Sequence, residues 1–311
     1  MTIKPTIGVD VSKDHLDAHR WPDGETCRVA NDAAGHRQLL RWIGAGVACV
    51  AFEATGAYHA AFERALHRAE VPCSKLNPAR VRRFAEALGA QAKTDRVDAR
   101  LIARMAAMAE PRLDQPKPAI LAGLHELQLA RTALLRERTA AKNRAGRLRL
   151  ALLRRQHATR LRQIERALAE VDAEVAALIA SDEGLARKAE ILCSIPGVSM
   201  VTAAAILAEL PELGSLEAAA AASIAGLAPF TRESGTWKGK AKIGGGRGDL
   251  RRALYFPALS AARFNPDLKT VYDRLRARGK SAKLALVAVM RKLVILANVL
   301  VRDDRIWQMR A

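Results

Sequence analysis

Three observations predict an α/β domain at the N-terminus, a long helical middle segment and a mostly α-helical C-terminal domain. Short apolar runs alternate with helical patterns up to about residue 108, residues 120–179 contain no proline, and the remainder is helical apart from one basic, glycine-rich interruption. A breaker with three prolines, PRLDQPKP, separates the first two parts. We therefore expect domains at residues 1–112, 113–190 and 191–311.

The first domain is expected to begin with antiparallel strands and to continue with alternating helices and strands. Apolar residues alternate with Gly8 and Asp10 in a first strand, so these two residues share one face of it. Asp23-Gly24 is a turn signal between two strand-like runs and predicts a hairpin. The later elements are a helix at HRQLLRWI, a buried strand at VACVAFEATG, a helix at YHAAFERALHRAE, a strand at VPCSKL, and helix up to RVDARLIARMAAM.

The middle segment has the pattern of one or two long helices. Its leucines and other aliphatic residues recur mostly at three- and four-residue steps, which predicts a coiled coil or a helical hairpin. From Arg131 to Arg166 there are 12 basic residues and 2 acidic ones. A solvated helix face normally mixes the two signs, so we favour a face that contacts a polyanion. The candidate contacts are Arg144, Arg147, Arg154 and Arg155.

A Pro-Gly turn lies between two helical runs in ILCSIPGVSMVTAAAILAEL. This arrangement resembles a helix-hairpin-helix, in which turn amides and the following helix N-terminus accept a phosphate. An ordinary turn between two packed helices explains the same pattern, and both interpretations stay open.

The charge balance points to a polyanionic partner. The 311 residues include 51 Lys and Arg against 32 Asp and Glu, a net charge of +19. The most apolar stretch, residues 284–301, is interrupted by Arg291 and Lys292, and the N-terminus lacks a signal-peptide pattern, so no membrane association is expected. The four cysteines lie far apart without a CxxC pair, which favours reduced thiols in the cytoplasm and, with the charge, association with the nucleoid.

Four carboxylates are candidate metal ligands. Asp10 lies within an apolar strand, Glu53 directly follows another apolar run, and Asp95 and Asp98 are spaced to share one face of a helix. Each has a simple structural explanation, such as a turn hydrogen bond or a helix-dipole interaction. Taken together, they are the oxygen ligands that Mg²⁺ or Mn²⁺ prefers, and such sites catalyse phosphoryl transfer.

A serine in a basic, glycine-rich segment is the candidate nucleophile. Ser234-Gly235 is expected in a loop, and no GxxxxGK[ST] or GxSxG motif accompanies it. A plain turn serine is the alternative. Tyr255 is the rival nucleophile, but its apolar neighbours at helical spacing suggest packing. The basic residues expected to contact nucleic acid here are Lys238, Lys240, Lys242, Arg247, Arg251 and Arg252.

Several motifs together resemble the DEDD-type insertion-sequence transposases, the insertion-sequence one-ten family. The N-terminal motifs are GVDVSKDHLDAH, FEATGAYH and KTDRVDARLIA, which contain the four acids. The C-terminal run from SIPGVSMVTAAAILAEL through GLAPFTRESGTWKGKAKIGGGR to KLALVAVMRKL is similar to the transposase domain of that family. The resemblance covers nearly the whole chain. It implies that the N-terminal domain is similar to the Holliday-junction resolvase RuvC, with an RNase H-like fold.

The resemblance implies a recombinase that excises and inserts a mobile element. The four acids would bind Mg²⁺, and Ser234 would form a covalent link to a DNA phosphate. Members of the family resemble an RNA-guided system, in which a structured bridge RNA pairs with donor and target DNA. The two domains would be halves of a composite site completed across protomers, so a homodimer that assembles into a tetramer is expected. The basic middle segment would contact RNA or a neighbouring protomer.

Two other functions fit part of the sequence. A metal-dependent, structure-specific endonuclease of the Holliday-junction type explains the acids and the basic charge but leaves the serine segment without a role. A DNA- or RNA-binding architectural protein explains the charge but not the position of Asp10 in an apolar strand.

Overall fold

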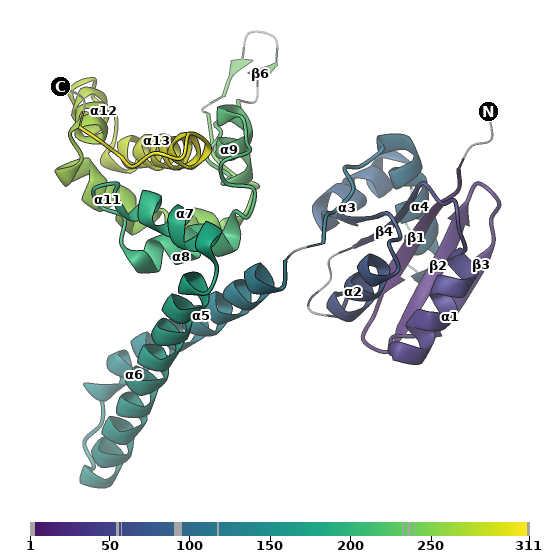
Figure 1. Ribbon diagram of the computed structural model, residues 1–311, viewed down its shortest axis with the longest axis horizontal. Helices are drawn as coiled ribbons and strands as arrows, with labels where there is room; N and C mark the ends of the chain where they lie inside the picture. Colours follow the sequence, from purple (N-terminus) through teal and green to yellow (C-terminus); the bar gives the residue numbers. More distant parts are fainter. Residues whose placement is uncertain are drawn as a thin grey trace. The chain divides into compact units, whose positions relative to one another are not determined.

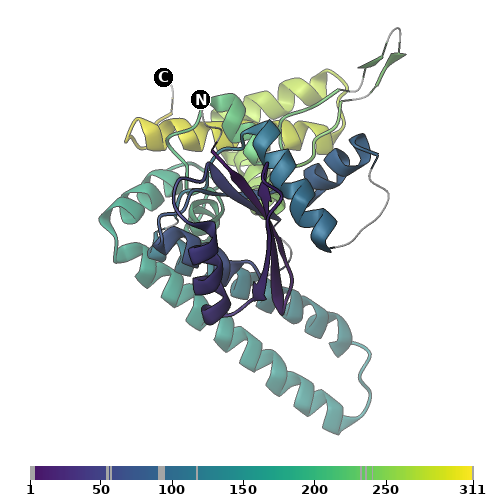
Figure 2. The same ribbon diagram turned by 90° about the vertical axis from the view of Figure 1, so that its right-hand side faces the viewer.

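The chain forms two compact units, Met1–Lys117 and Pro118–Ala311 (Figures 1 and 2). The computed structural model describes residues 4–53, 56, 58–89, 95–116, 118–231, 233–234, 237–239 and 241–309, without the side chains of residues 95–97, 233, 237 and 238. Each unit has its own hydrophobic core. The helical middle and the C-terminal part share the core of the second unit, and their separation into two domains stays a prediction.

The first unit is built on a mixed five-stranded sheet, as the alternation of strand and helix patterns predicts. The strands are β1 (Thr6–Val11), β2 (His15–Trp21), β3 (Thr26–Ala30), β4 (Cys49–Glu53) and β5 (Cys73–Leu76). Their order across the sheet is β3-β2-β1-β4-β5. β1, β2 and β3 pair antiparallel, and β4 and β5 extend the sheet in parallel with β1. The predicted hairpin at Asp23-Gly24 is confirmed as the β2–β3 connection.

Helices cover both faces of this sheet (Figure 2). They are α1 (Ala33–Ile43), α2 (Ala60–Arg68), α3 (Pro78–Ala87) and α4 (Asp95–Ala109). One face packs with α1 and α2 in a core that contains Phe52 and Phe62. The other face packs with α3 and α4 around Ala51 and Ile102. The apolar and polar alternation of β1 therefore directs its aliphatic residues toward α1 and α2, and its Gly8 and Asp10 face toward α4.

The backbone of α4 packs directly against the backbone of β1, and this close crossing is possible because Gly8 has no side chain. A Cβ at Gly8 would lie 2.2 Å from the Ala99 carbonyl oxygen and 2.3 Å from the Ala103 nitrogen. Further along the helix, the Arg104 guanidinium lies 6.0 Å from the ring of Trp21, which pairs with Thr6 at the start of β1. α4 therefore runs antiparallel to β1, and its N-terminus points toward the end of β1 that carries Asp10.

Replacing Gly8 by alanine is expected to destabilise the first unit by about 1–3 kcal/mol, since the new methyl group would meet backbone atoms that cannot rotate away. DNA cleavage should fall with it, because α4 would have to move. Urea unfolding measures the first effect. Gly146→Ala is the matched control, because a Cβ there would meet open space. A Gly8→Ala variant with wild-type stability would contradict the close crossing.

The second unit begins with an antiparallel pair of long helices, α5 (Ala119–Ala145) and α6 (Ala151–Ala180). Ala141, Ile164 and Leu168 pack between them, and Arg131 Nε lies 2.6 Å from Asp172 Oδ1. Of the two arrangements that the sequence allows, the helical hairpin is therefore observed (Figure 1).

Six shorter helices and α13 make up the rest of the unit's helical structure in the described residues. They are α7 (Glu183–Cys193), α8 (Met200–Glu209), α9 (Ala218–Ile224), α10 (Gly248–Ala253), α11 (Tyr255–Phe264), α12 (Pro266–Ala277) and α13 (Ala282–Arg302). By length and composition α13 could cross a membrane, but 56% of its most apolar window is buried inside the protein. Its buried Asn298 accepts a hydrogen bond from the Gly214 N–H (2.9 Å) and donates one to the Leu216 carbonyl (2.7 Å). α13 is thus the central core helix of the unit.

The Pro-Gly turn between α7 and α8 packs against α11. Gly197 has φ +99°, and a Cβ at this position would lie 2.7 Å from the Ala261 nitrogen. Ser199 then caps α8 by accepting a hydrogen bond from the Thr202 N–H at 3.4 Å. The glycine therefore has a packing role that needs no phosphate ligand.

Candidate functional site

Asp10 and Glu53 lie at the carboxyl ends of neighbouring parallel strands. The register pairs Val9 with Phe52, so the next step along β1 and β4 brings Asp10 alongside Glu53. Neighbouring strands are roughly 4.8 Å apart. Both side chains are half-buried. Since side-chain direction alternates along a strand, Asp10 shares the face of Gly8, which is the face that α4 covers.

The first turn of α4 brings the other acids to the same end of the sheet. Asp98 directly precedes Ala99, the residue whose carbonyl oxygen meets Gly8, and it is half-buried. Because α4 runs antiparallel to β1, residues before Ala99 extend from Gly8 toward Asp10. Asp95 is the first residue of α4, and its side chain lies outside the described residues. The structure therefore brings Asp10, Glu53 and Asp98 to one end of one sheet face.

The donor chemistry at this end fits a hard divalent cation. Every predicted ligand is a carboxylate, the group that Mg²⁺ and Mn²⁺ favour over nitrogen or sulfur donors. Within the described part of the chain, no three His, Cys, Asp or Glu side chains are close enough to form a ready metal site. The candidate set also includes the Asp95 side chain, which that description omits.

Asp17 is a further acid on this face that was not among the candidates predicted from the sequence. It pairs directly with Asp10 across β1 and β2, is 7% exposed, and lies 3.7 Å from the Arg28 Nε on β3. Its neighbour on the same face, His19, has a pKa lowered by burial and by the positive charge of Arg100. The hairpin register is the signal that could have found Asp17, since it places residues 10 and 17 opposite each other.

Ser234 lies in a short β-hairpin rather than in the loop that the sequence suggested. β6 (Glu233–Ser234) pairs with β7 (Trp237–Lys238), and Ser234 is opposite Trp237 (Figure 1). Before β6 and after β7, the backbones of Phe230 and Lys242 exchange two hydrogen bonds, of 2.9 and 3.0 Å. Ser234 is exposed. A nucleophile here would be open to a large substrate.

The basic residues near the hairpin differ in their surroundings. The Lys242 side chain is exposed. The Lys238 side chain and all of Lys240 lie outside the described residues. Arg252 forms an ion pair with Asp249.

Arg247 and Arg251 fasten the glycine-rich segment to the helical core. The Arg247 guanidinium donates two hydrogen bonds to the Glu212 carboxylate (2.7 and 2.8 Å) and one to the Glu209 carbonyl (2.8 Å). The hydrogen bond to Glu212 is the main reason for its raised pKa. Arg251 donates to the Gly245 carbonyl at 2.8 Å. Both guanidinium groups thus have protein acceptors, and their predicted contacts with nucleic acid stay a prediction.

The arginines at the end of the α5–α6 hairpin are all exposed. Arg144 donates to the Ala140 carbonyl (3.2 Å) and Arg154 to the Leu148 carbonyl (2.8 Å), and within the described part of the chain no carboxylate pairs with either guanidinium. Arg147 and Arg155 are also exposed. We call these four residues the hairpin tip.

Tyr255, the rival nucleophile, is not packed in the core as its neighbours suggested. It is 44% exposed, and its ring makes an edge-on contact with Phe256 at 5.4 Å between centroids.

Comparisons with known proteins cover nearly the whole chain. A family model described as Transposase matches residues 7–153, and one described as Transposase IS116/IS110/IS902 family matches residues 189–273. A pilin gene-inverting protein of Moraxella bovis is 30% identical over 331 aligned positions, which cover 99% of this chain and 98% of the relative. An uncharacterised protein of insertion element IS110 from Streptomyces coelicolor is 38% identical over 122 residues, 39% of this chain and 30% of the relative. The chain therefore belongs to the IS110 family of insertion-element transposases and is a DNA recombinase.

Proposed function

We propose that this transposase cuts and rejoins the DNA of its insertion element with Ser234 as the nucleophile and a divalent metal held by carboxylates. The acids are Asp10, Glu53, Asp95 and Asp98. The main support is that β1, β4 and the first turn of α4 present acids at one end of the same sheet face. The order of the five strands supports the further proposal that this unit is RNase H-like and similar to RuvC.

The proposed cleavage is a transesterification. The Ser234 oxygen bonds to phosphorus, the bond from phosphorus to one deoxyribose oxygen breaks, and the serine proton ends on the released DNA hydroxyl. One phosphoester replaces another, so the reverse step with a second DNA hydroxyl rejoins strands without an external energy source. When bound, Mg²⁺ or Mn²⁺ would offset the negative charge that develops on the phosphate oxygens. Lys238, Lys240 and Lys242 follow the serine and would hold the flanking phosphates.

The RNA-guided part of the proposal concerns target choice. We infer that a structured bridge RNA pairs with donor and target DNA, and that a homodimer, assembling to a tetramer, acts on both in the cytoplasm and at the nucleoid. The hairpin tip supports an RNA contact because its four exposed arginines lack carboxylate partners within the described residues. A coiled coil formed by α5 and α6 with a second copy belongs to the same proposal.

Trapping the reaction tests the nucleophile directly. Wild-type protein is incubated with Mg²⁺, guide RNA and labelled element-end DNA, then denatured and digested with protease. Mass spectrometry should find a nucleotide attached to the peptide that contains Ser234. Cleaved DNA with no protein attached at any time point would favour a structure-specific endonuclease that uses water.

Charge reversal at the hairpin tip, Arg144, Arg147, Arg154 and Arg155 to glutamate, should weaken nucleic-acid binding and flatten its salt dependence. Each lost phosphate contact lowers the slope of log K against log salt by about 0.9 for duplex DNA and about 0.7 for single strands. Titrations at several salt concentrations measure this slope. The control reverses Arg187, Arg302 and Arg305, which are exposed but held in ion pairs. Equal slopes for the tip variant and the wild type would contradict the contact.

A further inference from the structure

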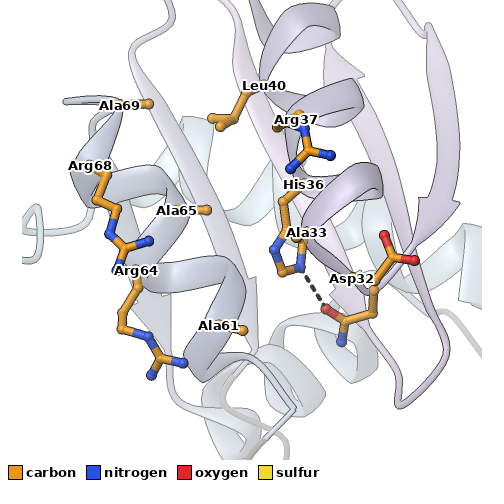
Figure 3. Close-up of a pocket in the computed structure, with 11 residues that line it drawn as sticks. Asp32, Ala33, His36, Arg37, Leu40, Ala61, Arg64, Ala65, Arg68 and Ala69 are labelled. Carbon is orange, nitrogen blue, oxygen red and sulfur yellow. Dashed lines mark hydrogen bonds between the residues drawn. The ribbon is translucent and has the colours of Figure 1, made fainter.

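A groove runs between α1 and α2, on the sheet face opposite to the one that carries the acids. Figure 3 shows arginines on both helices, with the alanines of α2 facing α1 across the gap. The groove has a volume of about 510 Å³. We call it the α1–α2 groove; the residues that define it are Arg37, Ala61, Arg64, Ala65, Arg68 and Ala69.

The three arginines of the groove lack partners in the described part of the chain. Arg37, Arg64 and Arg68 are exposed, and no hydrogen bond or ion pair engages their side chains there. In the same unit, Arg20 and Arg28 pair with Glu25 and Asp17. The groove arginines differ from these two in having no such partner within the described residues, and all three line one groove.

Acids near the groove are engaged elsewhere. The Asp32 carboxylate caps α1 by accepting a hydrogen bond from the Gly35 N–H at 2.8 Å. The Glu63 carboxylate accepts two from the Lys75 ammonium, at 2.7 and 2.8 Å. Three cations and the single lining carboxylate of Asp32 leave the groove positive.

The sequence of α2 places two of these cations where they repel each other. Arg64 and Arg68 are four residues apart on one side of a helix, so their like charges destabilise the helix when no anion is bound. The helical rise separates them by roughly 6 Å along the axis, similar to the spacing of successive phosphates on one strand. A polyanion in the groove would remove the repulsion and could contact both guanidinium groups.

The groove is open because small residues form its floor and a buried histidine fixes one wall. Ala61 and Ala65 on α2 and Ala69 at its C-cap recur at four-residue steps, so they present methyl groups where larger side chains would fill the gap (Figure 3). His36 on α1 is 5% exposed, and its Nε2 lies 2.8 Å from Asn31 Oδ1. Burial lowers the His36 pKa, so this wall is a neutral hydrogen-bonded ring and the arginines supply the charge.

We propose that the α1–α2 groove binds the phosphodiester backbone of a nucleic-acid strand that is not being cut. Guanidinium groups bind phosphate oxygens through paired hydrogen bonds, and an alanine floor lets the sugar-phosphate chain approach without a side-chain barrier. The acids lie on the α4 face, so a strand in the groove is separated from them by the sheet. The groove would hold guide RNA or a flanking part of the DNA, and both present the same phosphate chemistry.

Binding titrations with two probes of equal length, a single-stranded RNA and a duplex DNA, test the groove. The variant is Arg64→Gln with Arg68→Gln; the control, Arg302→Gln with Arg305→Gln, makes the same charge change at arginines paired with Asp303. For the bound probe, affinity should fall several-fold below that of the control, and the salt slope should decrease by about 1.4 for RNA or about 1.8 for DNA. The probe whose affinity falls shows whether RNA or DNA supplies the phosphates that bind in the groove.

A second variant, Ala65→Glu, places a carboxylate on the groove floor and keeps all three arginines. It should weaken binding of the same probe. Circular dichroism melting would show whether either variant unfolds. If both groove variants are folded and bind both probes as the control does, the proposal is overturned.

The outcome is separable from the serine and metal proposal. At saturating nucleic acid, the groove variants should still form the Ser234 adduct, since the acids and the serine are untouched. Weaker nucleic-acid binding by the groove variants, together with a normal Ser234 adduct, supports the groove proposal. A missing adduct in the wild type contradicts Ser234 as the nucleophile and does not bear on the groove proposal.

Discussion

Ser234→Ala is expected to abolish both the covalent protein–DNA adduct and the recombinant product, with nucleic-acid affinity unchanged. The substitution removes the atom that would form the phosphoester. Ser234 is exposed at the end of a two-residue strand, so loss of its hydroxyl should cost less than about 1 kcal/mol of stability. The measurements are adduct yield on denaturing gels, strand exchange, and affinity for element-end DNA.

Tyr255→Phe is the matched control, because it removes the hydroxyl of the rival nucleophile and keeps the ring contact with Phe256. This variant should recombine DNA like the wild type. Strand exchange that persists in Ser234→Ala but is lost in Tyr255→Phe would identify Tyr255, and not Ser234, as the nucleophile. Hydrolytic cutting that persists in Ser234→Ala, with no adduct in the wild type, would favour the endonuclease.

Asp10→Asn and Asp98→Asn are each expected to reduce DNA cleavage by at least about 100-fold while leaving binding intact. A metal that stabilises the developing phosphate charge contributes several kcal/mol, and each 1.36 kcal/mol is tenfold in rate. Affinity should hold because it comes mainly from contacts between basic residues and phosphates. Single-turnover cleavage in Mg²⁺ measures the effect, and removal of the metal with EDTA should reproduce it in the wild type.

Asp23→Asn is a control in the same unit, since Asn-Gly supports the same hairpin turn as Asp-Gly. It makes the same change from carboxylate to amide away from the α4 face and should cleave normally. Full recombination by Asp10→Asn or Asp98→Asn in Mg²⁺ would remove the metal assignment.

The strands and helices of the first unit follow from local patterns. Alternation around Asp10, the Asp23-Gly24 turn and the buried run that ends at Glu53 each predict an element that the structure contains. These signals involve residues that are close together in the chain, so they can be recognised from the sequence alone. The same alternation places Asp10 on the polar face of β1, which is why the acids could be identified as candidates.

Features that depend on how separate elements pair do not follow from the local pattern of any one element. Asp17 joins the acids because of the β1–β2 register, and Arg247 binds Glu212 across a separation of 35 residues. The β6–β7 hairpin has strands of two residues, too short to show an alternating pattern. The α1–α2 groove depends on how two helices lie on the sheet, which no single helix encodes.

The backbone crossing of α4 over Gly8 has a consequence for partly synthesised copies of the protein. Asp10 and Glu53 belong to strands near the start of the chain, but α4 begins at residue 95. A nascent or prematurely terminated polypeptide that stops before α4 would lack Asp95 and Asp98, and the helix that packs over Gly8 would be missing. Such fragments should be inert toward the host chromosome even where β1 and β4 pair. If the four acids hold the catalytic metal as proposed, their order along the chain ties DNA cutting to completion of the whole N-terminal unit.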